Sequence, residues 1–66
     1  MSQRIREVKD RGKLIILSDG SKWEISSFDA FHTMMWMPFD EIEVGVAHLI
    51  NVSRRSQRVS AQRTLR

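Results

Sequence analysis

The sequence predicts an all-β fold, a small SH3-like or OB-like barrel of five or six antiparallel strands with one short helical turn. Short β-prone runs recur along the 66 residues, turn signals separate them at close intervals, and the one stretch with helical spacing is too short to define a fold. Short strands joined by frequent turns are typical of small barrels and sandwiches. We therefore expect residues 1–66 to form a single small β-barrel domain.

The clearest element is a hairpin in LIILSDGSKWEIS, residues 14–26. Asp19 and Gly20 stand between two β-prone runs, and glycine adopts the positive φ that a tight hairpin turn requires without a Cβ clash. The pattern predicts strands at about 13–18 and 21–26.

The faces of these strands follow from the period of two. In the second strand, Trp23 and Ile25 share one face, and Lys22 and Glu24 share the other. A further turn at Gly12 makes RIREVK an earlier strand, which we expect to pair with KLIIL.

The period of two breaks in SSFDAFHTMM. Phe28, Phe31 and Met35 recur at helical spacing, which predicts a short helical turn at about 27–33. Pro38 then ends whatever precedes it, because proline disfavours helical geometry at the residue before it.

Alternation returns after the proline. DEIEV places Ile42 and Val44 on one face of a strand, with Glu41 and Glu43 on the other, and Gly45 is expected to open the next turn. AHLINV is the following strand, and SRRS is a polar loop. The last strand is QRVSAQRTL, whose inner positions are Val59, Ala61 and Leu65.

The composition excludes several classes of protein. The chain has no cysteine, so neither disulfides nor thiolate zinc sites can stabilise its small core. No apolar stretch approaches the roughly 20 residues that span a membrane, and no signal-peptide core follows the charged N-terminal residues. On the chain as given we expect a cytoplasmic location and no membrane contact.

Charge is segregated along the chain. The net charge is +3, from eleven basic and eight acidic side chains. Residues 19–43 carry six of the acids, and residues 44–66 carry five arginines and no acid. This segregation provides a local footprint for an anionic partner, but the acidic middle argues against a protein that coats DNA uniformly.

We predict a non-enzymatic binding or structural module that contacts another protein. The candidate contacts are the acidic strand at Glu41 and Glu43 and the aromatic stretch at Trp36 and Phe39. Catalysis has little support, because the carboxylates lie on turns and strand faces, and the histidines have no serine or cysteine partner in a nucleophile motif. We expect no enzyme activity and no cofactor, and we leave the oligomeric state open.

Nucleic-acid binding is the first alternative. Arg54, Arg55 and Arg58 lie in one short basic stretch, and a barrel with a basic strand and exposed aromatic side chains can hold a single strand through charge and stacking. Trp23 and Trp36 are the large aromatic surfaces for such binding, but a core of this size needs them inside. We therefore favour a solvated edge for the arginines.

The second alternative is a soft metal site in HTMMWM, which begins at His32. Imidazole and thioether groups suit Cu(I), and a tryptophan face can cap a cation. Methionine more commonly fills irregular gaps in a small core. We favour that role for Met34, Met35 and Met37 and assign no metal ligand.

With these motifs in order, the chain resembles a loosely defined group of small uncharacterised bacterial β-barrel proteins. The shared pattern is an apolar strand, Asp-Gly-Ser, a Trp-Glu-aliphatic strand, a Trp-x-Pro-Gly-Asp turn, an alternating aliphatic strand and a Leu-Ile-Asn strand before a basic end. It covers about residues 14–63. Trp36, Pro38 and Asp40 fit the turn, and Phe39 stands where the pattern has glycine. The resemblance implies a barrel and carries over no catalytic or ligand residue.

Overall fold

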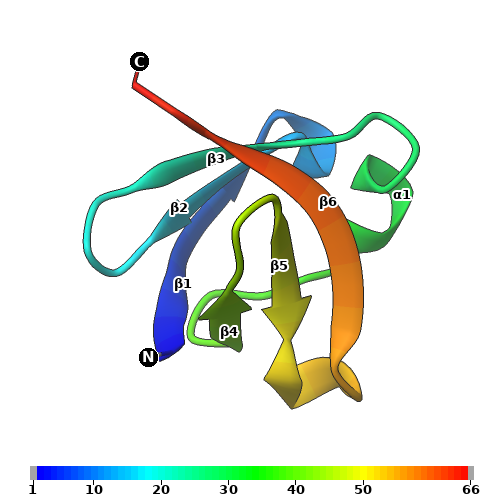
Figure 1. Cartoon of the computed structure of the whole chain (residues 1–66). Helices are drawn as coiled ribbons and strands as arrows, with labels where there is room; N and C mark the ends of the chain where they lie inside the picture. The colour runs from blue at the N-terminus through cyan, green and yellow to red at the C-terminus, as the bar shows by residue number, and fades with distance from the viewer. Residues whose placement is uncertain (1, 66) are drawn as a thin grey trace.

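The computed structural model describes residues 2–65, which form a closed barrel of six antiparallel strands (Figure 1). The strands are β1 (Ser2–Lys9), β2 (Leu14–Leu17), β3 (Lys22–Ile25), β4 (Glu41–Val44), β5 (His48–Asn51) and β6 (Gln57–Thr64). Their order around the barrel is β1-β2-β3-β6-β5-β4, and β1 closes the wall by pairing with both β2 and β4. The prediction of a small all-β barrel with one short helical turn is confirmed.

Three short helical segments lie between the strands. They are η1 (Asp10–Gly12), α1 (Ala30–Thr33) and η2 (Val52–Arg54), of which η1 and η2 are 3-10 turns. η1 packs closely on α1, because Gly12 has no side chain and a φ of 87°, and a Cβ there would overlap the backbone of Met34. The Thr33 hydroxyl strengthens this contact by donating to the Gly12 carbonyl.

The first hairpin lies where it was predicted, but its loop has three residues, 18–20, and not two, because the Leu17 N–H donates to the Ser21 carbonyl at 3.0 Å. Gly20 has a φ of 87°, and the Asp19 carboxylate accepts hydrogen bonds from the hydroxyl (2.6 Å) and the backbone N–H (2.9 Å) of Ser21. These bonds, the hydroxyl one first, hold the pKa of Asp19 below its ordinary value. The Ser21 hydroxyl accepts from Trp23 Nε1 at 3.0 Å. Trp23 and Ile25 are buried, and β1 pairs with β2, as predicted.

One apolar core fills the barrel. All but one of its members come from strands, and they alternate with outward-facing neighbours as a strand face requires. The exception is Trp36, which enters from the segment between β3 and β4. Among the residues that the structure describes, the members are Ile5, Ile15, Leu17, Trp23, Ile25, Trp36, Ile42, Leu49, Val59 and Ala61.

Two expectations at strand ends are wrong. Val44, the last residue of β4, is 39% exposed, and Leu65 is 98% exposed beyond the last paired residue of β6. Gly45 opens the connection to β5, as expected, but without a positive φ, and the connection has three residues, 45–47. Its lack of a Cβ instead leaves room for the His48 ring, which such an atom would overlap.

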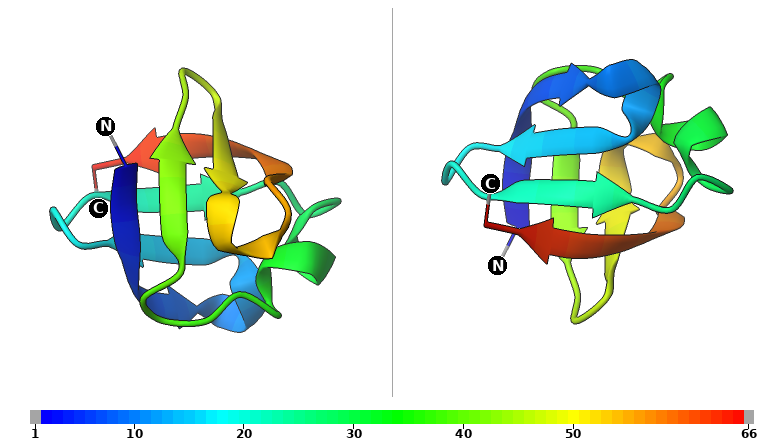
Figure 2. Two further views of the ribbon diagram at one scale, coloured as in Figure 1. Left: turned by 90° about the horizontal axis from the view of Figure 1, so that it is seen from below. Right: turned by 90° about the horizontal axis from the view of Figure 1, so that it is seen from above.

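The longest connection joins β3 to β4. It comprises residues 26–40, contains α1, and passes along one side of the barrel (Figure 2). We refer to this segment as the β3–β4 connection. It places α1 beside the start of β6 and then returns the chain to the opposite part of the wall, where β4 begins.

Candidate protein-binding surface

The β3–β4 connection carries most of the exposed apolar side chains. Of ten large apolar side chains exposed within residues 2–65, six belong to this connection, with exposed fractions from 52% to 90%. These six, which we name the apolar connection surface, are Phe28, Phe31, Met34, Met35, Met37 and Phe39. They include every phenylalanine of the sequence. A concentration of exposed apolar side chains is typical of a contact site, whereas isolated ones need no explanation.

Three other residues hold the connection against the barrel. Ala30 and Thr33 are buried on the inner side of α1, and Trp36 is 3% exposed in the core. Trp36 Nε1 donates to Gln57 Oε1 at 2.7 Å, so the one polar atom of the indole has a partner. Ala30, Thr33 and Trp36 follow one another at intervals of three positions, and this interval determines which side of the connection faces the core.

Two predictions for this segment are wrong for that reason. Trp36, predicted as a surface contact, falls on the inner side, three residues after Thr33. The methionines, predicted as core residues, fall between and beyond the anchors and are exposed; they are Met34, Met35 and Met37. With Trp36 in the core, the cation-capping face that the soft-metal alternative requires is not at the surface.

Gln57 connects the core tryptophan to a surface histidine. An indole N–H can only donate, so Gln57 Oε1 faces Trp36 and the Gln57 amide nitrogen faces His32 Nδ1, 3.1 Å away. His32 Nδ1 is then an acceptor, and the network assigns the ring proton to Nε2. The imidazole stacks on Phe31, with centroids 5.7 Å apart and planes 8° from parallel. The exposed Phe31 ring is therefore connected to the buried Trp36 through His32 and Gln57.

Asp40 fixes the other end of the connection. Its Oδ2 accepts hydrogen bonds from Met37 N (3.1 Å), Asn51 Nδ2 (3.0 Å) and Arg54 Nε (2.8 Å). Partial burial opposes ionisation of this carboxyl, but the bonds from Asn51, Arg54 and Met37 outweigh it and lower the Asp40 pKa below its ordinary value. The turn before Asp40 holds Phe39 at a φ of 75°, in the left-handed region that L side chains rarely adopt.

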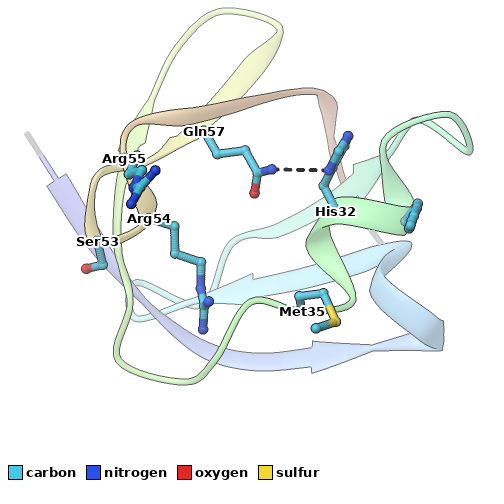
Figure 3. Close-up of a pocket in the computed structure, with 7 residues that line it drawn as sticks. His32, Met35, Ser53, Arg54, Arg55 and Gln57 are labelled. Atoms are coloured by element: carbon cyan, nitrogen blue, oxygen red, sulfur yellow. Dashed lines mark hydrogen bonds between the residues drawn. The ribbon is translucent and has the colours of Figure 1, made fainter.

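An open groove of about 540 Å³ lies between α1 and η2. Its lining residues are Phe31, His32 and Met35 from α1 and the residues after it, Ser53, Arg54 and Arg55 from η2 and its end, and Gln57 from β6. Figure 3 shows the two groups on opposite sides, with the Gln57 amide directed at His32. The groove therefore has an apolar side and a cationic side.

The structure brings together two of the three predicted arginines. Arg54 and Arg55 line the groove. Arg58 instead lies on β6 opposite Ile50, with its Nη2 3.5 Å from His48 Nδ1, and does not line the groove. The predicted cluster is therefore divided between two parts of the surface.

The predicted acidic contacts stand on β4. Glu41 and Glu43 flank the buried Ile42, as the alternation predicts, and are paired across the ladder with Arg4 and Ser2 of β1. Neither lines the groove, although the Glu41 backbone N–H donates to the hydroxyl of the lining residue Ser53 at 3.0 Å. Of the four residues predicted as protein contacts, Trp36 alone is buried in the core.

Five residues of the apolar connection surface were not predicted as contacts from the sequence. A signal for them was present, because all three phenylalanines and three methionines fall within residues 28–39. A four-residue helix and a proline turn cannot direct six large side chains into a core that strand residues already fill. The missed residues are Phe28, Phe31, Met34, Met35 and Met37.

Comparison with protein-family models, with curated proteins and with solved structures finds no match to this chain. The finer assignment as an SH3-like or OB-like barrel and the resemblance to small bacterial barrel proteins therefore stay predictions. Within residues 2–65, no three histidine, aspartate or glutamate side chains lie together as a group that could hold a metal ion. None of the helical segments described has the length and apolar character needed to cross a membrane.

Proposed function

We propose that this chain is a non-enzymatic protein-binding module and that the apolar connection surface is its contact. The observation that carries the proposal is the exposure of every phenylalanine and three methionines outside a core filled by aliphatic side chains and both tryptophans. Burial of one side chain of this size is worth about 1.5–3 kcal/mol. Six such side chains on one connection therefore favour a partner that covers them.

The residue types and their supports fit a protein partner. Methionine is flexible and adapts its shape to a contact, and aromatic side chains and methionine are both enriched at protein interfaces. Phe31 is held in place by its stack on His32. Phe39 is 77% exposed and is kept in a strained backbone conformation, a combination typical of residues retained for function.

Nucleic-acid binding is supported less well. A phosphate backbone is held by several cations in series, and the salt dependence of binding follows their number. Arg58 lies apart from Arg54 and Arg55, and Arg54 is paired with Asp40 at 2.8 Å. The three arginines predicted for the nucleic-acid alternative therefore do not form a continuous track of free cations.

The proposal is tested by selecting random peptides displayed on phage against the immobilised protein. We expect enrichment on the wild type and loss of binding by about tenfold or more, equivalent to about 1.4 kcal/mol, for selected peptides on Phe31→Ser and Met35→Ser. Val46→Ser is the matched control, because Val46 is 99% exposed in the β4–β5 connection, and it should bind as the wild type does. Circular dichroism confirms that each variant is folded.

Two results would contradict the proposal. One is the absence of enrichment on the wild type, or equal loss in the Val46→Ser control. The other is micromolar binding of a labelled oligonucleotide that survives physiological salt and disappears in the triple variant Arg54→Ala/Arg55→Ala/Arg58→Ala, which would establish the nucleic-acid alternative instead.

A further inference from the structure

The Arg54 guanidinium is fixed from one side only. Its Nε donates to Asp40 Oδ2 at 2.8 Å, and Asp40 is itself held by Asn51 and by the Met37 backbone N–H. The terminal nitrogens Nη1 and Nη2 have no hydrogen-bond partner within the described chain. The Arg54 side chain is 38% exposed and lines the groove. Arg54 is thus an oriented guanidinium with unused donors at a solvent-accessible site.

Arg55 adds a second cation beside it. It ends η2 in the left-handed conformation, with a φ of 57°, and its side chain makes no hydrogen bond or ion pair with any residue that the structure describes. No acidic side chain is among the described residues that line the groove. Asp40 neutralises one of the two arginines, so this side of the groove keeps an uncompensated positive charge.

The opposite side of the groove is apolar and partly rigid. Phe31 and Met35 are four positions apart in the sequence, about one helical turn, and both are largely exposed. Phe31 is stacked on His32, which Gln57 holds in turn. Figure 3 shows Met35 and His32 across the groove from Arg54 and Arg55. A ligand in the groove therefore meets oriented N–H donors on one side and an aromatic ring and a thioether on the other.

We propose that the groove binds a carboxylate of an acidic side chain in the partner's segment, with a large apolar side chain of that segment against Phe31 and Met35. The inference rests on the proposed function and names the chemistry of the partner. A carboxylate matches the paired terminal N–H groups of a guanidinium, which can hold both of its oxygens at once. The volume of about 540 Å³ lies in the range of pockets that hold a small ligand, so it accommodates a few side chains.

A single carboxylate fits the groove better than a phosphate chain does. Among residues 2–65, two arginines line it, and Arg58, the next arginine in sequence, belongs to another part of the surface. With Arg54, Arg55, Asp40 and one bound carboxylate, the formal charges of the site sum to zero. Removing an ion pair from water is favourable only where each charge has an oppositely charged, hydrogen-bonded partner.

The test uses two phage-displayed peptide libraries that are random except at one central position, fixed as Glu in one library and as Gln in the other. We expect recovery on the wild type to be about tenfold higher from the Glu library, equivalent to about 1.4 kcal/mol. This preference should disappear on Arg54→Gln and on Arg55→Gln. Arg58→Gln removes the same charge outside the groove and should keep the preference.

The outcomes separate this inference from the proposed function. Binders that are lost on Met35→Ser but show no preference for Glu would retain the protein-binding module and overturn the carboxylate site. Equal loss of the preference on Arg58→Gln would also overturn it, because net charge would then be the cause. Arg55→Gln keeps the test decisive if Arg54→Gln disturbs the Asp40 turn, since Arg55 has no partner in the described structure to lose.

Discussion

Large apolar side chains are buried in the barrel wall and mostly exposed in the β3–β4 connection. In the strands, Ile15, Leu17, Ile42 and Leu49 are completely buried, and in β3 and β6 polar residues alternate with the buried ones and face outward. In the connection, a small alanine, a threonine and one tryptophan face inward, and the phenylalanines and methionines face solvent. Large apolar side chains therefore stabilise the core in the strands and remain exposed to solvent in the connection.

A small chain can carry a contact site without weakening its core when that site lies outside the strands. Strand alternation commits every second residue to the interior, so a run of consecutive large apolar side chains cannot all be exposed on a strand. Of its side chains the connection buries only Ala30, Thr33 and Trp36, and it can present its apolar exposed side chains to a partner. Substitutions at the two kinds of position should therefore act on different properties.

Exchange of Trp36 for alanine should have the largest effect on stability. Trp36→Ala removes a buried aromatic side chain and should lower the free energy of unfolding by about 3–5 kcal/mol, close to the whole stability of a domain this small. Phe31→Ala should change it by less than about 0.5 kcal/mol, because Phe31 is exposed. Thermal melts followed by circular dichroism compare the two variants. Similar midpoints for Trp36→Ala and Phe31→Ala would show that Trp36 contributes no more to stability than an exposed residue does.

Removal of the Thr33 hydroxyl should have the next largest effect. Thr33→Val keeps the shape of the side chain but leaves the buried Gly12 carbonyl without this donor, which should cost about 1–3 kcal/mol. Thr33→Ser retains the hydroxyl and is the control. Urea unfolding measures both variants, and a Val variant as stable as the Ser variant would show that packing alone attaches α1 to η1.

The Asp40 turn should make stability depend on pH. The folded-state pKa of Asp40 is below its ordinary value of 3.8, so its contribution is fully present above that pH and is lost as the pH falls through the folded-state pKa. We expect Asp40→Asn to cost about 1–2 kcal/mol at neutral pH, the low end for bonds to a charged group because Arg54 is partly exposed.

The measurement compares thermal midpoints of the wild type and Asp40→Asn from neutral pH to about pH 2. The two midpoints should approach each other as the solution becomes more acidic. The comparison also cancels the contribution of Asp19, whose pKa is lowered in both proteins by the Ser21 hydrogen bonds. A difference between midpoints that stays constant over this range would assign the effect of Asp40→Asn to shape and not to charge.

The smallest predicted effect is a gain. Phe39→Gly relieves a left-handed conformation and, after the entropy cost of glycine, should raise the stability by about 1 kcal/mol, or the melting temperature by about 4–8 °C. Phe39→Ala keeps a Cβ at the same φ of 75° and should not gain. If Phe39 is retained for contact, Phe39→Gly should also weaken the selected peptides. Equal melting temperatures for Phe39→Gly and Phe39→Ala would show that the left-handed backbone conformation at this position does not cost stability.

Local patterns were sufficient to predict the barrel wall. The positive φ of Gly20, the inward faces of Trp23 and Ile25, and the burial of Val59 and Ala61 each follow from a few neighbouring residues. Turn chemistry and a period of two act over that distance, so one sequence is enough to recognise them.

The site could not be predicted in the same way, because it depends on contacts between distant residues. Arg54 meets Asp40 across 14 positions, and Gln57 meets His32 across 25. Whether an apolar residue of the connection turns inward depends on how much space the strands leave, and the sequence pattern does not contain that volume. The methionines were therefore assigned to the wrong side, and Trp36 was predicted both as a surface contact and as a core residue.

The closure of the sheet limits how a partner can bind. Each of the six strands has a hydrogen-bonded neighbour on both sides, although β1 and β6 divide their length between their two neighbours. The apolar connection surface lies outside all six strands, so a partner that covers it does not add a strand there. Recognition at this surface acts through side chains, and a partner's backbone amides need not contribute. A bound segment could therefore be a helix or an irregular loop, and methylation of its backbone nitrogens should leave its affinity largely unchanged.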